Sequence, residues 1–401
     1  TPPIFKRGLT PVTRLSVFEG GFDEPAAREV ADVGRPQLLA LRNRSMLELN
    51  RGGRFGWHPL LEVFIKERSA AGSTGKDALA EVRDRHARHY FDLMRRCEDL
   101  GQGGQSHLAI TTLRTEHPNW EAAWHHAVDQ GWWELLGSLG AYIGLSYHVE
   151  GRQDWFRDLQ RLALAKVPRG TAPWAHLELG DAFFDMLEDR YELAYQRHGA
   201  AVDVLRPLAE EDPYRFGWAL LLHGVAAANV GRLDEAFVLT LGTVREFERA
   251  GRHDMLGMPY HNLVAHSLKP ADHERWYDAY MQWHAANAPD DNYASVLQIH
   301  GNYLSLMYGE HRSGAGHVCR AMDIELAAEW DPISLAAMHW EVAVITARSG
   351  DHAAALAQLD ALEAYAADKL PNKADVRDYR AHADALRALM QLQHDAAADG
   401  E

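Results

Sequence analysis

The 401-residue sequence contains only two cysteines, Cys97 and Cys319, and no run of about 18 apolar residues. Two cysteines cannot build the disulfide framework of a small secreted domain, so we expect a reducing, cytoplasmic location. The lack of a long apolar run predicts that no segment spans a membrane. The chain also begins at Thr1 without a methionine or a secretion signal, which suggests a piece of a larger protein.

Positive charge is scarce over most of the chain. The formal net charge is −16; residues 1–70 hold 11 Lys/Arg against 8 Asp/Glu, a charge of +3, so the remaining residues carry −19. An acidic surface repels polyanions, and we therefore do not expect DNA contact, although Arg35, Arg42 and Arg44 form a modest basic set. The change of charge predicts a domain boundary near residue 70.

Motifs for catalysis and for metal binding are also missing from the sequence. It has no Walker A loop, no His-Glu-x-x-His sequence, no paired cysteine ligands and no Gly-x-Ser-x-Gly elbow. Residues 72–76 (GSTGK) have the wrong spacing for a phosphate loop, which favours a plain linker. We therefore expect no catalytic residue, no metal and no cofactor in this chain. An all-α carbohydrate-active enzyme stays an alternative, because sequence spacing does not reveal paired carboxylates.

The first 70 residues combine helix starts with one ribbon pattern. Residues that cap or open helices stand at Thr10-Pro11, Asp23-Glu24-Pro25 and Pro36, and the first helix is expected to end at Gly20-Gly21. The segments that follow are an alternating strand (45–50), a tight turn (51–53), a returning strand (54–57) and a fourth helix (59–70). This order predicts a winged helix over residues 1–70.

Beyond residue 77 the sequence predicts only helices, which are separated by short glycine turns. These turns contain Gly151, Gly231, Gly251 and Gly350. Several segments fit the tetratricopeptide pattern, a helical hairpin that repeats about every 34 residues, with small residues such as Gly224/Ala236 and Ala343/Ala355 at the helix crossing. The predicted fold is mostly α: a winged helix, a helical connector over 71–130, and a TPR-like superhelical solenoid over 131–395.

Four stretches resemble the region that follows the nucleotide-binding domain in STAND-type (NB-ARC) signalling ATPases, above all bacterial transcriptional regulators. They are Arg14–Phe22, Leu38–Leu49, Trp57–Leu61 and Glu116–Ala123, the last of which looks like the start of that family's helical repeats. The resemblance implies an upstream nucleotide-binding domain in cis, which would bind ATP or ADP in the parent protein. It also implies that the winged helix packs on that domain.

His58 is the position that looks like the histidine of that family's Met-His-Asp-like motif, which touches the phosphates of bound ADP. The flanking residues depart from the pattern, because Trp57 and Pro59 stand in their place. A structural role is the alternative, since His58 can end a strand and precede a helix that opens with Pro59. The resemblance implies nucleotide sensing by His58 in the intact parent.

The first helix of each predicted hairpin should line a concave face, which is the default binding surface of a solenoid. Polar and aromatic residues there would orient a ligand. The candidates in this register are Asp181, Asp185, Asn229, Asn262, Asn302, Trp340 and Arg348. We therefore expect a regulatory module of a STAND-type protein that senses a small-molecule inducer. A TPR scaffold that docks a protein or peptide without sensing a small molecule is the alternative.

Overall fold

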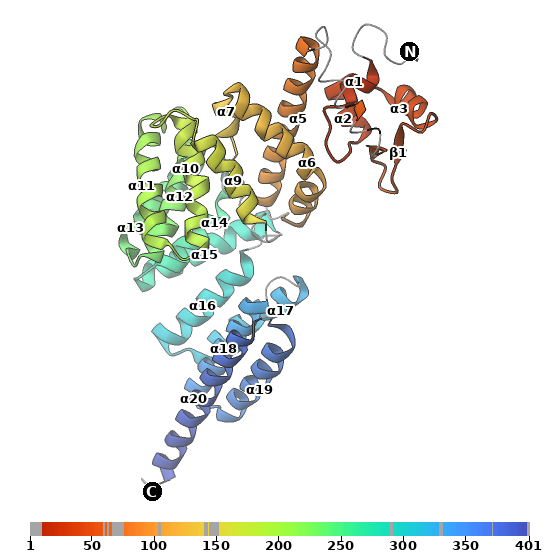
Figure 1. Cartoon of the computed structure of the whole chain (residues 1–401). Coiled ribbons are helices and arrows are strands. Elements are labelled where there is room, and N and C mark those ends of the chain that lie inside the picture. Colours follow the sequence, from red (N-terminus) through yellow and green to blue (C-terminus); the bar gives the residue numbers. More distant parts are fainter. Residues whose placement is uncertain are drawn as a thin grey trace. The chain divides into compact units, whose positions relative to one another are not determined.

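The computed structural model describes residues 10–58, 61, 64–65, 76–102, 106–139, 143, 152–288, 292–328, 332–370 and 372–398 (Figure 1). The chain forms two compact units, Thr1–Val230 and Gly231–Glu401. Apart from one short ribbon and one isolated bridge near the N-terminus, the described elements are helices. The predicted mostly α fold is confirmed.

Three short helices open the first unit: α1 (Pro11–Leu15), α2 (Glu24–Ala31) and α3 (Arg35–Arg42). Each has a proline in its first turn, where the missing N–H costs nothing. The side chains of Thr10 and Asp23 cap α1 and α2 by accepting the backbone N–H groups of Thr13 and Ala26, at 3.3 and 2.8 Å. The three predicted helix starts are therefore confirmed.

The ribbon consists of β1 (Leu47–Leu49) and β2 (Phe55–Trp57), which pair antiparallel with Leu47 opposite Trp57. Phe22 extends it, because its backbone N–H and C=O both bond to Phe55, at 2.9 and 2.7 Å. The ribbon therefore lies where the alternating pattern predicts it. The fourth predicted helix (59–70) lies largely outside the described residues, of which Leu61 and residues 64–65 are helical.

The prediction that the first helix ends at Gly20-Gly21 is wrong, because α1 ends at Leu15. The chain turns there and stacks Phe18 on Phe22, with ring centroids 4.5 Å apart. The two glycines instead allow the chain to pack closely against Pro118 and β2. A Cβ on Gly20 would lie 2.7 Å from the Pro118 ring, and a Cβ on Gly21 would lie 2.9 Å from a backbone oxygen of β2.

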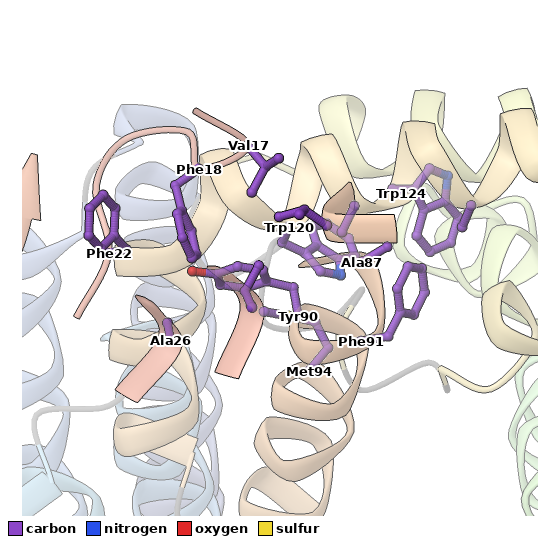
Figure 2. Packing of buried hydrophobic residues seen from close by; sticks show 14 of the residues in the cluster. Val17, Phe18, Phe22, Ala26, Ala87, Tyr90, Phe91, Met94, Trp120 and Trp124 are labelled. Atoms are coloured by element: carbon purple, nitrogen blue, oxygen red, sulfur yellow. The ribbon is translucent and has the colours of Figure 1, made fainter. Parts of the chain in front are cut away.

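Helices α5 (Lys76–Gln102) and α6 (Ser106–Gln130) pack against each other, and α5 also packs against α1 and α2. Aromatic side chains fill the space between them, as Figure 2 shows. The large, fully buried members of this core include Phe18, Phe22, Tyr90, Phe91, Trp120 and Trp124. The N-terminal segment, α5 and α6 therefore share one hydrophobic interior. Burial of these large rings stabilises it.

Asn119 of α6 ties the N-terminal segment to this core by polar contacts. Its Oδ1 accepts the backbone N–H of Glu19 at 2.7 Å, and its Nδ2 donates to the carbonyl of Gly21 at 2.8 Å. Nearby, Arg54 of the ribbon makes two contacts with the carboxylate of Glu116, one of them at 2.9 Å. Contacts between residues 62 to 100 positions apart thus fix the ribbon and the loop before α2 against α6.

Replacing the buried Asn119 with leucine is expected to lower the free energy of unfolding by about 2 kcal/mol, because it removes the acceptor of the Glu19 N–H and the donor to the Gly21 carbonyl. Urea denaturation followed by tryptophan fluorescence measures the change. The matched control is Asn229→Leu, whose exposed side chain bonds only to its own helix and should change stability by less than about 0.5 kcal/mol. Equal effects of the two substitutions would contradict this account of the Asn119 contacts.

The rest of the first unit is a succession of packed helices. They are α7 (Trp133–Leu136), α9 (Gln153–Leu164), α10 (Ala172–Leu187), α11 (Tyr191–Leu205), the 3-10 helix η2 (Arg206–Leu208) and α12 (Pro213–Asn229). Neighbours along the chain pack together, α9 on α10, α10 on α11 and α11 on α12, and α10 also contacts α12. Consecutive packing of this kind is the arrangement of helical repeats.

The second unit continues the pattern. Its helices are α13 (Leu233–Arg249), η3 (His253–Met255), α14 (Gly257–His266), α15 (Pro270–Asn287), α16 (Tyr293–Tyr308), α17 (His311–Ala328), α18 (Pro332–Arg348), α19 (His352–Lys369) and α20 (Lys373–Ala398). The predicted small pair Ala343 and Ala355 is fully buried where α18 packs on α19. In the part of the chain described beyond residue 76 no strand occurs, as predicted.

The glycine turns end helices as the sequence predicts. Gly231, Gly251 and Gly350 follow α12, α13 and α18 with φ of +81°, +69° and +80°, a conformation that costs glycine little. Gly151 lies outside the described residues. Glycine at these positions therefore stops each helix and lets the chain reverse into the next one.

Candidate ligand-binding site

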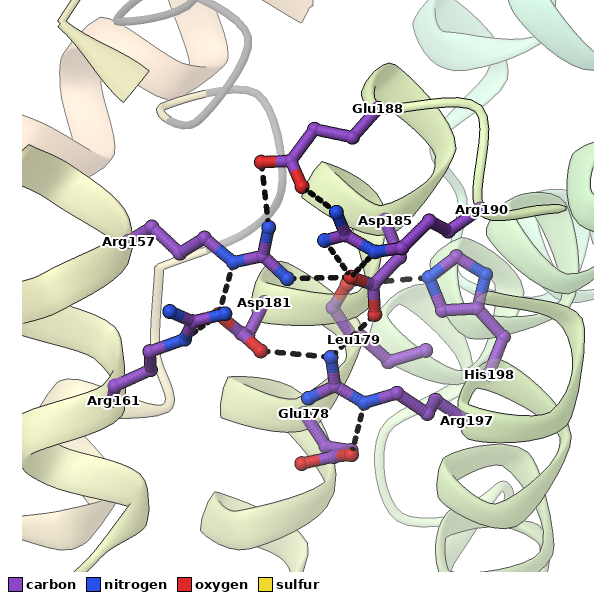
Figure 3. Close-up of polar contacts among 10 residues, drawn as sticks. All are labelled: Arg157, Arg161, Glu178, Leu179, Asp181, Asp185, Glu188, Arg190, Arg197 and His198. Carbon is purple, nitrogen blue, oxygen red and sulfur yellow. Dashed lines mark hydrogen bonds and ion pairs between the residues drawn. The ribbon is translucent and has the colours of Figure 1, made fainter. Parts of the chain in front are cut away.

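Two of the predicted site residues, Asp181 and Asp185, lie one turn apart on α10 and are buried. Figure 3 shows the arginines that surround them, which come from the two neighbouring helices and the turn before α11. Arg157 of α9 donates to Asp181 at 3.1 Å and to Asp185 at 2.5 Å. Arg197 of α11 reaches the second oxygens of the same carboxylates, at 2.8 and 2.6 Å.

Four further residues complete this cluster, which we call the ion-pair network. Arg161 of α9 pairs with Asp181 at 3.4 Å. Arg190 donates to Asp185 at 2.5 Å, Glu188 accepts from Arg157 at 2.7 Å, and Glu178 accepts from Arg197 at 2.6 Å. Charges removed from water must be paired, because an unpaired buried ion costs several kcal/mol. The network therefore joins α9, α10 and α11 through side chains that satisfy one another.

The pKa values within the network follow from this pairing. Burial opposes ionisation of Asp185, but hydrogen bonds from Arg190, Arg197 and Arg157 outweigh it and lower the pKa of this carboxyl. Burial also acts against the charge on Arg157, and its bonds to Glu188 and Asp185 nevertheless raise its pKa. Both groups are thus held in their charged forms at neutral pH.

A pocket of about 590 Å³ opens over the ion-pair network. Its lining carries charges of both signs and one apolar side chain: Asp154, Arg157, Asp158, Arg161, Asp185, Glu188, Arg190, Leu193 and Arg197. The exposed residues of this lining include Asp154, Asp158 and Arg161, whereas Asp185 is fully buried beneath the pocket. Such a lining suits a strongly polar ligand or the charged side chains of a peptide.

A second and smaller pocket, of about 220 Å³, lies between α5, α10, α12 and the turn after α7. We call it the α5–α12 pocket. Its lining combines apolar, aromatic and charged groups: Arg95, Glu98, Asp99, Gly137, Ser138, Leu139, His176, Leu179, Tyr214, Arg215, Trp218 and Leu222. None of these residues was selected from the sequence, because they come from separate segments that extend from Arg95 to Leu222 and meet only in the folded chain.

The remaining predicted residues of the repeats lie in different environments. Asn229 is exposed at the end of α12, and Arg348 is exposed at the end of α18. Asn262 is buried, and its Oδ1 accepts from the Nδ1–H of His261 at 2.9 Å. Trp340 packs beside His382, with ring centroids 5.5 Å apart. Ligand binding by these residues stays a prediction.

Asn302 of α16 hydrogen-bonds to Glu341 of α18, the residue that follows Trp340. Gln298, one turn earlier on α16, donates to the same carboxylate at 3.0 Å. Burial raises the pKa of Glu341, and the two amide donors oppose this shift. The structure thus brings Asn302 and the neighbour of Trp340 together within the second unit.

His58 is half-buried and follows β2 directly. Its backbone carbonyl accepts the N–H of Leu61 at 2.8 Å. This geometry agrees with a strand-ending position. Nucleotide sensing by His58 stays a prediction.

Three observations concern sites of other kinds within the described ranges. No group of three or more His, Cys, Asp or Glu side chains there is placed to hold a metal ion. Cys97 is a buried free thiol and Cys319 an exposed one. None of the described helices is both long and apolar enough to span a membrane.

Comparison with known proteins gives a match in structure alone. No family model matches the sequence, and no curated protein matches it. A solved structure of a signal transduction ATPase with numerous domains (STAND) that has a tetratricopeptide repeat sensor, from Pyrococcus horikoshii, is similar with a TM-score of 0.62 and 16% identity. The match covers 94% of this chain and 52% of that protein, so the chain spans about half of its length. The chain therefore shares the all-helical, TPR-like repeat fold of a STAND protein with a tetratricopeptide repeat sensor.

Proposed function

We propose that this chain is the sensor and interaction module of a STAND-type signal transduction protein. The observation that carries the proposal is the fold likeness over 94% of the chain to a STAND protein with a TPR sensor. The charged and mixed pockets of the first unit give such a module surfaces for a ligand. The module itself binds and does not catalyse.

In this proposal residues 1–70 form a winged helix that contacts a nucleotide-binding domain in cis. The order α1, α2, α3, β1, β2 supports this interpretation. Arg54 and Asn119 connect the ribbon and the preceding loop to α6, so a movement of α6 would reach the N-terminal segment. His58 would then report the nucleotide state, ADP or ATP, of the parent protein.

A sensor of this kind works by shifting an equilibrium between a closed, ADP-bound state and an open, assembling state. The ligand has to bind the open state more tightly, since equal binding to both states shifts nothing. Contacts between the ligand and the repeats supply the free energy of binding. The connector helices α5 and α6 transmit the conformational change to the winged helix. The output of the parent protein would be transcription regulation or another signal.

The proposal is tested by the melting temperature of the chain with sugars, nucleotides, amino acids and basic peptides. A ligand that binds the folded state stabilises it by mass action, by about 2.7 kcal/mol at 100 times its Kd. We expect one class of ligand to raise the melting temperature by several degrees. A rise with basic peptides alone, which disappears at high salt, would indicate a docking scaffold. No rise with any class would overturn the proposed sensing and docking roles.

A further inference from the structure

The α5–α12 pocket has an apolar and aromatic interior. Leu139, Leu179 and Leu222 are buried, and the rings of Tyr214 and Trp218 lie 6.5 Å apart at 88°. A volume of about 220 Å³ corresponds to about seven water molecules at liquid density. The pocket therefore has room for a small molecule of about the size of one amino acid.

Charged groups of both signs stand beside this apolar interior. Glu98, which is only 7% exposed, and Asp99 come from α5, as does Arg95, whereas Arg215 comes from α12. Each arginine forms an ion pair with a carboxylate three positions earlier in the chain. Arg95 pairs with Asp92 of α5, and Arg215 pairs with Asp212 at the start of α12. Partly exposed pairs of this kind are worth about 0–1 kcal/mol, so both guanidinium groups can turn to a ligand.

The balance of charges restricts the chemistry of the ligand. A simple anion would meet Glu98 and Asp99, and a simple amine would meet Arg95 and Arg215. A molecule with one ammonium group, one carboxylate and a short apolar part would match the acidic, the basic and the apolar residues of the pocket. Burial, and then the charge of Arg215, lowers the pKa of His176 to about 4, so its neutral imidazole can both donate and accept at neutral pH.

We propose that the α5–α12 pocket binds a free amino acid with an apolar or aromatic side chain, which is the inducer of the module. Glu98 and Asp99 bind the α-ammonium group, Arg215 and Arg95 bind the α-carboxylate, and the side chain contacts Trp218 and the leucines. This inference rests on the proposed sensor function and names its ligand class.

The location of the pocket gives the ligand a regulatory consequence. Its lining joins the connector helix α5 to the repeat helices α10 and α12, all within the first unit. A bound amino acid would therefore link α5 to the repeats through its two charged ends. Because α5 also packs against α2, binding would stabilise one arrangement of the connector and the N-terminal helices.

The test is isothermal titration calorimetry on the whole chain with L-leucine, L-methionine, L-phenylalanine and L-tryptophan. Each is compared with analogues that lack one charge, for example phenethylamine and 3-phenylpropanoate for L-phenylalanine. We expect at least one amino acid to bind, and both of its analogues to bind at least about 10-fold more weakly, because each loses a charge-assisted bond. These comparisons use the unaltered chain, so they do not depend on the folding of a variant.

Two variants then locate the site. Arg215→Gln and Glu98→Gln should each weaken binding at least about 10-fold, whereas Arg245→Gln, an exposed control on α13, should leave it within about twofold. Circular dichroism checks that each variant is folded. The inference is overturned if no amino acid binds at about 10 mM, if the amine or the acid binds as tightly, or if both variants keep full affinity. If the inference is overturned but a sugar, nucleotide or peptide still raises the melting temperature, the proposed sensor function is retained with a different ligand.

Discussion

Replacing Asp185 with asparagine is expected to lower the free energy of unfolding by about 3–5 kcal/mol, the usual cost of breaking a buried ion pair. Asp185 is fully buried, and its two oxygens accept from Arg157, Arg190 and Arg197 at distances from 2.5 to 2.6 Å. An amide in this place leaves three guanidinium groups without their shared countercharge. Urea denaturation followed by tryptophan fluorescence measures the loss.

Asp158→Asn is the matched control, because Asp158 is exposed on α9 and lines the same pocket. It should change stability by less than about 0.5 kcal/mol. If Asp185→Asn were as mild as this control, the ion-pair network would not be a major stabilising element. The position of Asp181 at the same arginines provides a second variant, Asp181→Asn, with an effect of the same sign.

The same network predicts a dependence of stability on pH. The pKa of Asp185 is lower in the folded chain than the unfolded value of about 3.9. Its contribution is therefore fully present above about pH 4 and is lost as the pH falls through the folded pKa. The difference in stability between the unaltered chain and Asp185→Asn should be constant from about pH 5 to pH 7, which is about one to three units above the unfolded pKa of aspartate. It should shrink in more acidic buffer.

Replacing Gly314 with alanine is expected to lower the free energy of unfolding of the second unit by about 3 kcal/mol, which is the upper end of the usual cost of overpacking a core. Helices α16 and α17 cross at Gly301 and Gly314, where a Cβ on Gly314 would lie 2.4 Å from the carbonyl oxygen of Gly301. A contact with backbone cannot be relieved by rotating a side chain, so the helices must move apart. Thermal unfolding followed by circular dichroism measures the effect.

The control for this change is Gly316→Ala on the same helix. A Cβ at Gly316 would have no neighbour within 4 Å, and alanine favours a helix by about 1 kcal/mol over glycine. We therefore expect Gly314→Ala to lower the melting temperature and Gly316→Ala to raise it slightly. Shifts of the same sign for both would contradict the close crossing of α16 and α17.

The sequence predicts those parts of the fold that depend on local chemistry. Thr10 and Asp23 cap helices where they were expected, and Gly251 and Gly350 end them, because capping and left-handed turns involve only a few adjacent residues. The end of the first helix was predicted wrongly. The stacking of Phe18 on Phe22 and the approach of Gly20 to Pro118 are tertiary contacts, which the local pattern does not contain.

The candidate sites depend on contacts between distant residues, and the sequence shows them only in part. Asp181 and Asp185 share a face of α10 and were selected, but nothing local identifies Arg157 as their partner. A usable signal was the spacing of Arg157 and Arg161, which also share a helix face. The α5–α12 pocket gave no such signal, since Glu98 and Trp218 are brought together only by the packing of the helices.

Proton NMR tests most directly the proposal that this chain binds a ligand and does not transform it. The whole chain is mixed with the panel of amino acids, sugars and nucleotides, saturation-transfer spectra are recorded, and the composition of the mixture is followed over a day. We predict saturation transfer to one class of molecule and no change in composition. New resonances from a product would contradict the binding role by revealing an enzyme, and the absence of saturation transfer to every class would contradict small-molecule sensing.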